Sequence, residues 1–167
     1  KQIKKIDNIV EQMLFYARSD SVEKDYFVKK VLLEDVVHTA IMNYMDSLIQ
    51  KKISLDVYNL ENYVYIDEKW ITFIMCQVLQ NSIKYLNKPE KVIKIHSENN
   101  KNNVVLVIED NGEGILDHDL PRVFEYGFTG TDRQKQYSTG IGLYLCKKLC
   151  NKMNLDIKIE SQYKKFT

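Results

Sequence analysis

QVLQNSIKY, residues 77–85, is the stretch that decides the fold of this sequence. It lies in a predicted helix that begins after Asp67, a favourable N-cap residue. At about 100° per residue, Gln77, Asn81 and Lys84 fall on one narrow stripe, and apolar residues supply most of the remaining surface. An amide oxygen is a hard, neutral ligand suited to Mg²⁺, and a lysine beside it suits phosphate. Considered alone, the stripe is more often a solvent-exposed polar face.

A second segment, DNGEGI at residues 110–115, directly follows a predicted apolar strand. Asp110 ends that strand, where its carboxylate can accept a hydrogen bond from an amino group. Gly112 and Gly114 lack side chains, so a flat ligand can approach the backbone closely. An ordinary turn is the alternative, because Asp-Asn-Gly is a common turn sequence.

A third segment, STGIGL at residues 138–143, opens a predicted helix at Gly140. Backbone N–H groups at a helix start, with no Cβ in the way, form an anion site. The spacing matches neither the dinucleotide-binding GxGxxG pattern nor the phosphate-binding GxxxxGK[ST] loop. Taken alone, GxG at a helix start is weak evidence for a phosphate site.

Between the two glycine segments lies a long stretch with little periodicity, residues 115–139, which we expect to be a lid. Phe124 and Phe128 could dock their rings when the lid closes, and Arg133 and Lys135 could then reach a terminal phosphate. The alternatives are a local apolar core for the two phenylalanines and solvated surface for the two cations.

The predicted fold class is α+β: a two-layer sandwich of a mixed sheet with helices on one face. Strands are predicted at 27–32, 53–57, 63–66, 91–97, 104–109 and 155–161, with a polar turn at 98–103, and helices at 34–50, 68–86 and 140–153. A chain of 167 residues fits one domain with a small appendage. Its net charge of +1 leaves no basic excess for nucleic acid. Cys146 and Cys150 are expected to pack in a core.

The first 18 residues carry an a/d seam of apolar side chains, namely Ile3, Ile6, Val10, Met13 and Ala17. This seam predicts part of a dimerisation helix, or else an ordinary amphipathic helix packed on its own domain. We expect residues 1–20 to be the C-terminal part of the dimerisation helix, 21–26 a linker, and 27–167 the catalytic domain. No apolar run is long enough to span a membrane, so any anchor is expected outside this chain.

In this order, the segments resemble the histidine-kinase branch of the superfamily that also contains gyrase-type topoisomerases, heat-shock ATPase chaperones and mismatch-repair ATPases. Residues 77–85 look like the N-box, 110–115 like the first glycine box, 124–128 like the F-box and 139–143 like the second glycine box. The resemblance covers roughly residues 25–161 and implies a Bergerat-type ATP-binding fold. A narrower likeness, to bacitracin-type intramembrane-sensing kinases of Firmicutes, lies in Asp67–Trp70, Arg122–Phe124 and Gly127–Gly130.

The resemblance implies ATP and Mg²⁺ as ligands, with a role for each matching residue. Asn81 would hold the Mg²⁺ that bridges the phosphates, Lys84 would contact a phosphate, and Asp110 would select the adenine amino group. The implied catalytic residues are Asn81, Lys84 and Gln77. The implied nucleotide site comprises Asn81, Lys84, Tyr85, Asp110, Gly112, Gly114, Ile115, Phe124, Phe128, Arg133, Thr139, Gly140, Ile141, Gly142 and Leu143.

Gln77 departs from the family pattern. It stands where such kinases commonly have Asn and where the hydrolysing relatives have a basic Glu. An amide cannot take a proton from water, which counts against an ATP hydrolase. The hydrolase stays one alternative, and a degenerate kinase-like module that binds a partner without nucleotide is another.

The resemblance also implies how the parent protein works. It would be a homodimeric kinase that phosphorylates a histidine on its dimerisation helix and then a response-regulator protein. The chain would be a cytoplasmic domain of a cell-membrane protein. His38, His96 and His118 do not lie in a phosphoacceptor context, so we expect the acceptor outside this chain and no autophosphorylation by the chain alone.

Overall fold

The structure, a computed structural model, describes residue 14 and residues 26–100, 103–130 and 139–163. Most of the predicted dimerisation helix and linker, and also Arg133 and Lys135, lie outside the described residues. Among the residues that are described, no helix is both long and apolar enough to cross a bilayer. The chain divides into two compact units, Phe27–Gly114 and Ile115–Gln162.

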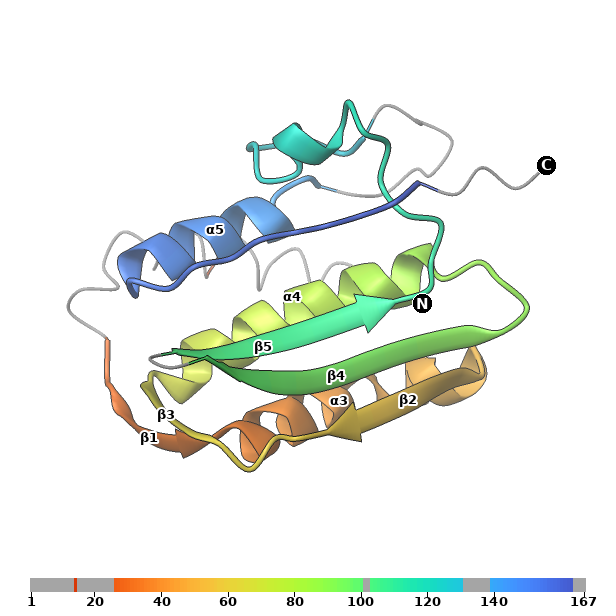
Figure 1. The fold of residues 1–167 in the computed structure, drawn as a ribbon. Helices are drawn as coiled ribbons and strands as arrows, with labels where there is room; N and C mark the ends of the chain where they lie inside the picture. The colour runs from red at the N-terminus through yellow and green to blue at the C-terminus, as the bar shows by residue number, and fades with distance from the viewer. Residues whose placement is uncertain (1–13, 15–25, 101–102, 131–138, 164–167) are drawn as a thin grey trace. The chain divides into compact units, whose positions relative to one another are not determined.

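The unit Phe27–Gly114 is built on a mixed sheet with helices on one face. Its elements in chain order are β1 (Lys29–Leu32), α3 (Leu33–Gln50), β2 (Ile53–Tyr58), β3 (Tyr63–Ile66), α4 (Glu68–Tyr85), β4 (Lys91–Asn100) and β5 (Asn103–Asp110). β2 pairs parallel with β4, and β4 pairs antiparallel with β5, whereas β1 and β3 form a separate antiparallel pair. α3 and α4 pack together against the three-stranded sheet (Figure 1). The predicted α+β class with a mixed sheet is confirmed.

The core of this unit follows from residue spacing. In α3, the buried side chains recur three and four residues apart, as in Leu33, Val36, Val37 and Ala40, which gives the helix one apolar face. On the sheet side, alternate residues of β4, Ile93 and Ile95, contribute buried side chains to the core. The largest fully buried side chains described in this unit are Val36, Val37, Trp70, Met75, Leu79, Leu86, Ile93 and Ile95.

The bounds predicted for the polar turn, 98–103, are too wide. β4 continues to Asn100 and β5 resumes at Asn103, with these two residues paired. A polar run at the exposed end of a hairpin can still form backbone ladder bonds, because its side chains stay in solvent. The long hairpin fixes the register in which Asp110, at the other end of β5, pairs with Ile93.

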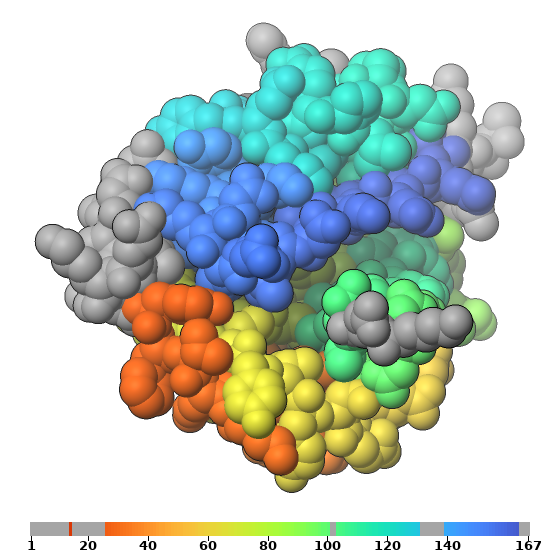
Figure 2. Space-filling view, turned by 60° about the vertical axis from the view of Figure 1, so that its left-hand side comes forward, coloured from red at the N-terminus to blue at the C-terminus, as the bar shows by residue number. Residues whose placement is uncertain are grey.

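The unit Ile115–Gln162 contains a short 3₁₀ helix, η1 (Leu120–Arg122), and α5 (Gly142–Lys152). After α5, the chain reverses at Asn154, whose φ is 55°, and runs back beside the helix (Figures 1 and 2). The strand predicted at 155–161 is absent here. Exposure alternates from residue to residue between 153 and 160, as the period-2 pattern required, but no strand partner is assigned within the described residues.

Candidate nucleotide-binding site

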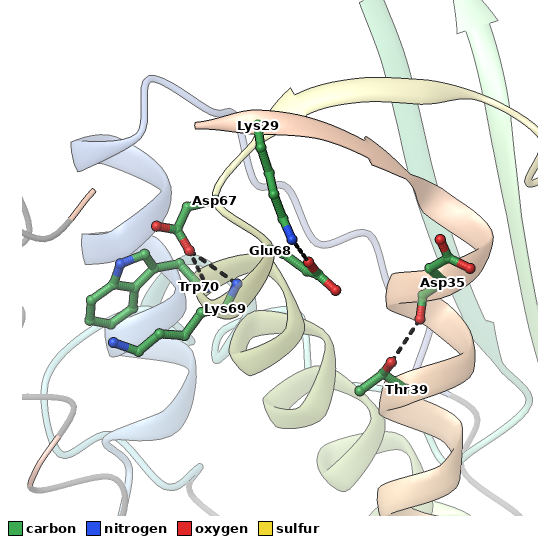
Figure 3. A network of polar contacts seen from close by, with 7 residues as sticks. All are labelled: Lys29, Asp35, Thr39, Asp67, Glu68, Lys69 and Trp70. Carbon is green, nitrogen blue, oxygen red and sulfur yellow. Dashed lines mark hydrogen bonds and ion pairs between the residues drawn. The ribbon is translucent and has the colours of Figure 1, made fainter. Parts of the chain in front are cut away.

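Helix α4 is held at both of its ends by side chains. At its start, the buried Asp67 caps the helix: its Oδ1 accepts hydrogen bonds from the N–H groups of Lys69 at 3.0 Å and Trp70 at 3.3 Å (Figure 3). At its end, the ammonium of Lys51 donates to the carbonyl oxygen of Ile83. Desolvation, and then the nearby charge of Lys91, lower the pKa of Lys51.

The predicted polar stripe of α4 is present, but its members differ in exposure. Gln77 is 8 % exposed and belongs to the core, whereas Asn81 and Lys84 are half-buried. The Lys84 ammonium donates to the Tyr85 hydroxyl at 3.1 Å and lies 4.7 Å from the centre of that ring. The last two turns of α4 therefore offer an accessible amide and an oriented cation.

The turn after β5 lies against the end of this helix. Asp110 is exposed, and its Oδ1 accepts a hydrogen bond from the Gly112 N–H at 2.9 Å. A Cβ on Gly112 would lie 2.7 Å from that oxygen and 3.0 Å from the carbonyl oxygen of Tyr85. A side chain at Gly112 would displace the Asp110 carboxylate and crowd the Tyr85 carbonyl, so the packing brings Asp110, Gly112 and Tyr85 together. Gly114 has a φ of 80°, in the left-handed region.

Asn111 is a residue whose role we did not predict from the sequence. Its side chain accepts from the Val92 N–H at 2.9 Å and donates to the Glu90 carbonyl at 3.0 Å, while its own N–H donates to the Val92 carbonyl at 3.2 Å. These bonds attach the Asp110 turn to the beginning of β4. The Asp-Asn-Gly sequence signals a turn, but a partner 19 residues earlier leaves no local signal.

In the second unit, two predicted motifs meet. The Gly127 N–H donates to the Gly140 carbonyl at 3.1 Å. Both glycines have positive φ, 74° for Gly127 and 67° for Gly140. A Cβ on Gly140 would lie 2.3 Å from the Gly127 carbonyl carbon, which no side chain allows. The F-box and second glycine box are therefore joined backbone to backbone.

The two predicted lid phenylalanines are half-buried, and each has a cation beside its ring. The Arg122 guanidinium carbon lies 4.5 Å from the Phe128 ring centre, and the Lys147 ammonium lies 5.9 Å from that of Phe124. Arg122 also pairs with Glu125 at 3.0 Å. We did not predict a role for Arg122 or Lys147. Their contacts make the segment around the F-box a locally ordered structure.

Helix α5 begins at Gly142, two residues later than predicted. Its N-cap, Ile141, offers no side-chain acceptor to the first turn, and the Ile141 N–H itself donates to the Thr139 hydroxyl at 3.4 Å. The N–H groups of a first helical turn have no partner within the helix. Leu143, in that turn, is half-buried. The start of α5 thus has the uncapped form that an anion contact requires.

The buried thiols of α5 have no chemical part in this arrangement. Burial raises the pKa of Cys146, and it raises that of Cys150 to about 11. They pack in the core, as predicted. In the described part of the chain, no group of three His, Cys, Asp or Glu side chains could hold a metal ion. A metal bound at α4 would therefore need most of its ligands from a bound phosphate and water.

Comparison with known proteins agrees with the predicted family. A family model described as "Histidine kinase-, DNA gyrase B-, and HSP90-like ATPase" matches residues 66–167. The sensor protein BceS of Halalkalibacterium halodurans is 37 % identical over 94 % of the chain, and the sensor protein kinase GraS of Staphylococcus aureus is 34 % identical over 98 %. The chain spans about half of these relatives, 47 % of each.

Solved structures agree on the fold. The mycobacterial sensor histidine kinase MprB superposes with a TM-score of 0.66 over 77 % of this chain and 81 % of its own, at 21 % identity. The family model covers more than half of the sequence and includes α4, both glycine boxes and the F-box. This chain therefore belongs to the family of histidine kinase-, DNA gyrase B- and HSP90-like ATPases.

Proposed function

We propose that this chain is the ATP-binding catalytic domain of a two-component sensor histidine kinase. The observation that carries the proposal is the close approach of Gly112 to the Tyr85 carbonyl oxygen, because it brings Asp110 next to the end of α4. An adenine-selecting carboxylate and a phosphate-binding helix must be neighbours if one nucleotide is to touch both. The histidine-kinase relatives favour a kinase over the other members of the family.

The phosphate end of the nucleotide is assigned to α4 and the start of α5. Asn81 would supply one amide oxygen to Mg²⁺, and Lys84 would neutralise phosphate charge from its position over Tyr85. The half-buried Asn81 fits this role because a neutral oxygen ligand leaves the remaining positions to phosphate and water. The bound Mg²⁺ would supply charge neutralisation of the phosphates. Gly140 and Gly142 would present backbone N–H groups to the same charge.

The adenine end is assigned to the turn after β5. The exposed Asp110 carboxylate would accept a hydrogen bond from the adenine amino group, which guanine lacks at that position. Gly112 and Gly114 would leave room for the ring, and Tyr85 would pack beside it. We further propose that Ile115, Phe124 and Phe128 complete the site with Thr139, Ile141 and Leu143. Arg133 and Lys135 keep their assignment as lid cations.

In the reaction we propose for the parent protein, a histidine imidazole nitrogen attacks the γ-phosphorus of ATP. The bond from that phosphorus to the β–γ bridging oxygen breaks, an N–P bond forms, and ADP leaves. The acceptor would lie on a dimerisation helix, and the group would pass to a response-regulator aspartate. Gln77 cannot act as a base for water and is buried, which favours transfer over hydrolysis. A homodimer and a membrane anchor outside this chain belong to the same proposal.

Titration with a fluorescent ATP analogue in the presence of Mg²⁺ tests the site. We expect Asn81→Ala to weaken binding by about tenfold or more, because a metal and phosphate contact is lost. Gln80→Ala is the matched control, since Gln80 is half-buried on the same helix and has no assigned role; it should bind within about twofold of the wild type. Equal affinities of the wild type and Asn81→Ala would contradict the assignment. Asp110→Asn should narrow the preference for ATP over GTP.

A second experiment separates the alternatives. A chain extended upstream to include the acceptor helix is incubated with γ-labelled ATP. Acid-labile, base-stable label on the protein supports the kinase. Steady phosphate release without protein label would instead support the hydrolase. Absence of both nucleotide binding and label would support the degenerate binding module.

A further inference from the structure

We propose that Asp67 is a positioning residue that couples the chain entering β1 to helix α4, so that movement upstream and occupancy of the nucleotide site affect each other. The inference rests on the proposed function, because it takes α4 as the helix that binds Mg-ATP. It concerns a residue far from the phosphates: Asp67 precedes Asn81 by 14 positions, or roughly 21 Å along a helix at 1.5 Å per residue.

The two carboxylate oxygens of Asp67 serve different segments. Oδ1 accepts from the Lys69 and Trp70 N–H groups in the first turn of α4. Oδ2 accepts from the Phe27 N–H at 2.8 Å, which is 40 residues earlier in the chain. Asp67 is only 4 % exposed; its bond to Trp70 is buried, and its bonds to Phe27 and Lys69 are part-buried. One buried side chain therefore bonds the entering chain and the α4 start at the same time.

The bond from the Phe27 N–H to Asp67 lies at the end of the β1–β3 strand pair. β1 and β3 pair with Lys29 opposite Ile66, and α4 begins two residues after Ile66. β3 ends at Ile66 and α4 begins at Glu68, so the hydrogen-bond ladder between β1 and β3 stops there. The Phe27 N–H therefore has no β3 carbonyl opposite it to accept its hydrogen bond. The Asp67 carboxylate takes the place of that next acceptor. The entering chain is thus attached to the helix cap rather than to another strand.

A second contact spans the same two elements. Lys29 of β1 forms an ion pair with Glu68, the first residue of α4, and Figure 3 shows the two side chains meeting beside Asp67. Both partners are substantially exposed, so this pair contributes little by itself. It does hold β1 beside the first turn of α4. The bonds of the buried Asp67 carboxylate, rather than the exposed pair, carry the coupling.

The rest of α4 transmits a change at its cap because the helix is anchored in the core. Trp70, near the cap, is completely buried, and so is Leu79, two residues before Asn81. A packed helix shifts as a unit rather than bending locally. Loss of the Phe27 bond would free the carboxylate and alter the orientation of the cap. Because coupling is reciprocal, the proposal implies that binding at the far end changes the strength of the Phe27 bond.

Substitution at one position separates the two functions of Asp67. Asp67→Asn keeps one oxygen, and asparagine is as good an N-cap as aspartate. The oxygen is expected to stay with the two donors of α4, so the Phe27 N–H loses its acceptor. Asp67→Ala loses both functions. Asp35→Asn is the matched control, because Asp35 lies in the first turn of α3 and loses the same charge (Figure 3).

The measurement is hydrogen exchange of single backbone amides by NMR, with and without Mg-ATP. In the wild type, we expect the Phe27 amide to exchange more slowly when Mg-ATP is bound. In Asp67→Asn, it should exchange about fivefold to tenfold faster than in the wild type, and the response to Mg-ATP should disappear. The Lys69 and Trp70 amides should keep their protection. Asp35→Asn should behave as the wild type.

Two results would overturn the inference. One is an unchanged exchange rate of the Phe27 amide in Asp67→Asn. The other is a wild-type Phe27 amide that ignores Mg-ATP although the fluorescence titration shows binding. If the titration shows no binding at all, the proposed function fails instead. The bond between Phe27 and the Asp67 side chain would still be tested by the exchange rates without nucleotide.

Discussion

Among the glycines compared in the described part of the chain, Gly140 has the least room for a side chain. Its φ of 67° already disfavours any other residue, and an added Cβ would lie 2.3 Å from the Gly127 carbonyl carbon. Gly127 is a natural comparison because its φ is 74° but nothing lies within 4 Å of an added Cβ. The two positions therefore separate backbone strain from crowding.

We expect Gly140→Ala to cost about 3 kcal/mol or more of unfolding free energy, through strain and displacement of the Gly127 backbone together. Gly127→Ala should cost only about 1–2 kcal/mol, which is the strain alone. Urea unfolding of both variants measures the difference. Equal losses would show that the Gly127–Gly140 contact is looser than the structure has it.

At the scale of elements, Asn111 joins the turn after β5 to the beginning of β4. Asn111→Ala removes its side-chain bonds to Val92 and Glu90, and we expect a loss of about 1–3 kcal/mol in stability. Nucleotide affinity should fall as well, because the Asp110 carboxylate is no longer fixed beside α4. Urea unfolding and the fluorescence titration check the two effects.

Asn100→Ala is the matched control for that substitution. Asn100 is exposed at the end of β4 that lies away from the Asn111 bonds. Its replacement should therefore change the unfolding free energy by less than about 0.5 kcal/mol and leave nucleotide affinity unchanged. If Asn111→Ala also left both quantities unchanged, the turn would be held by its backbone bond alone.

For the whole molecule, stability in alkaline solution should be set by the buried thiols of α5. Cys150 has its pKa raised from 9.0 to about 11, and that of Cys146 is raised too. Between pH 9 and 11, the unfolded chain loses thiol protons that the folded chain keeps. Ionisation then favours the unfolded state, so stability falls as pH rises, by at most about 1.4 kcal/mol per pH unit for each thiol.

Lys51 acts in the opposite direction. Its pKa is lowered, so the unfolded chain holds its proton at higher pH than the folded chain does, and stability rises with pH through that interval. Lys51 is exposed to solvent, so the buried thiols should dominate. Urea unfolding from pH 8 to 11 should show a net fall that flattens in the Cys146→Ala, Cys150→Ala double variant and persists in Cys76→Ala. A fall unchanged in the double variant would rule out the thiols as its cause.

The sequence determined those features that depend on neighbours in the chain. The cap at Asp67, the apolar face of α3 and the stripe through Gln77, Asn81 and Lys84 follow from spacing along a helix, which a local pattern records. The glycine segment after Asp110 was predicted for the same reason. The strand predicted at 155–161 failed because alternation predicts exposure but not a partner.

Only the tertiary structure decided which distant segments touch. Gly127 against Gly140, Asn111 against Val92 and Phe27 against Asp67 each join residues 13 to 40 positions apart. Such contacts depend on the register of strands and on how helices pack, and many registers satisfy the same local pattern. The sequence named the residues that fit a nucleotide, but folding set the packing of Gly112 against Tyr85 that brings Asp110 to the end of α4.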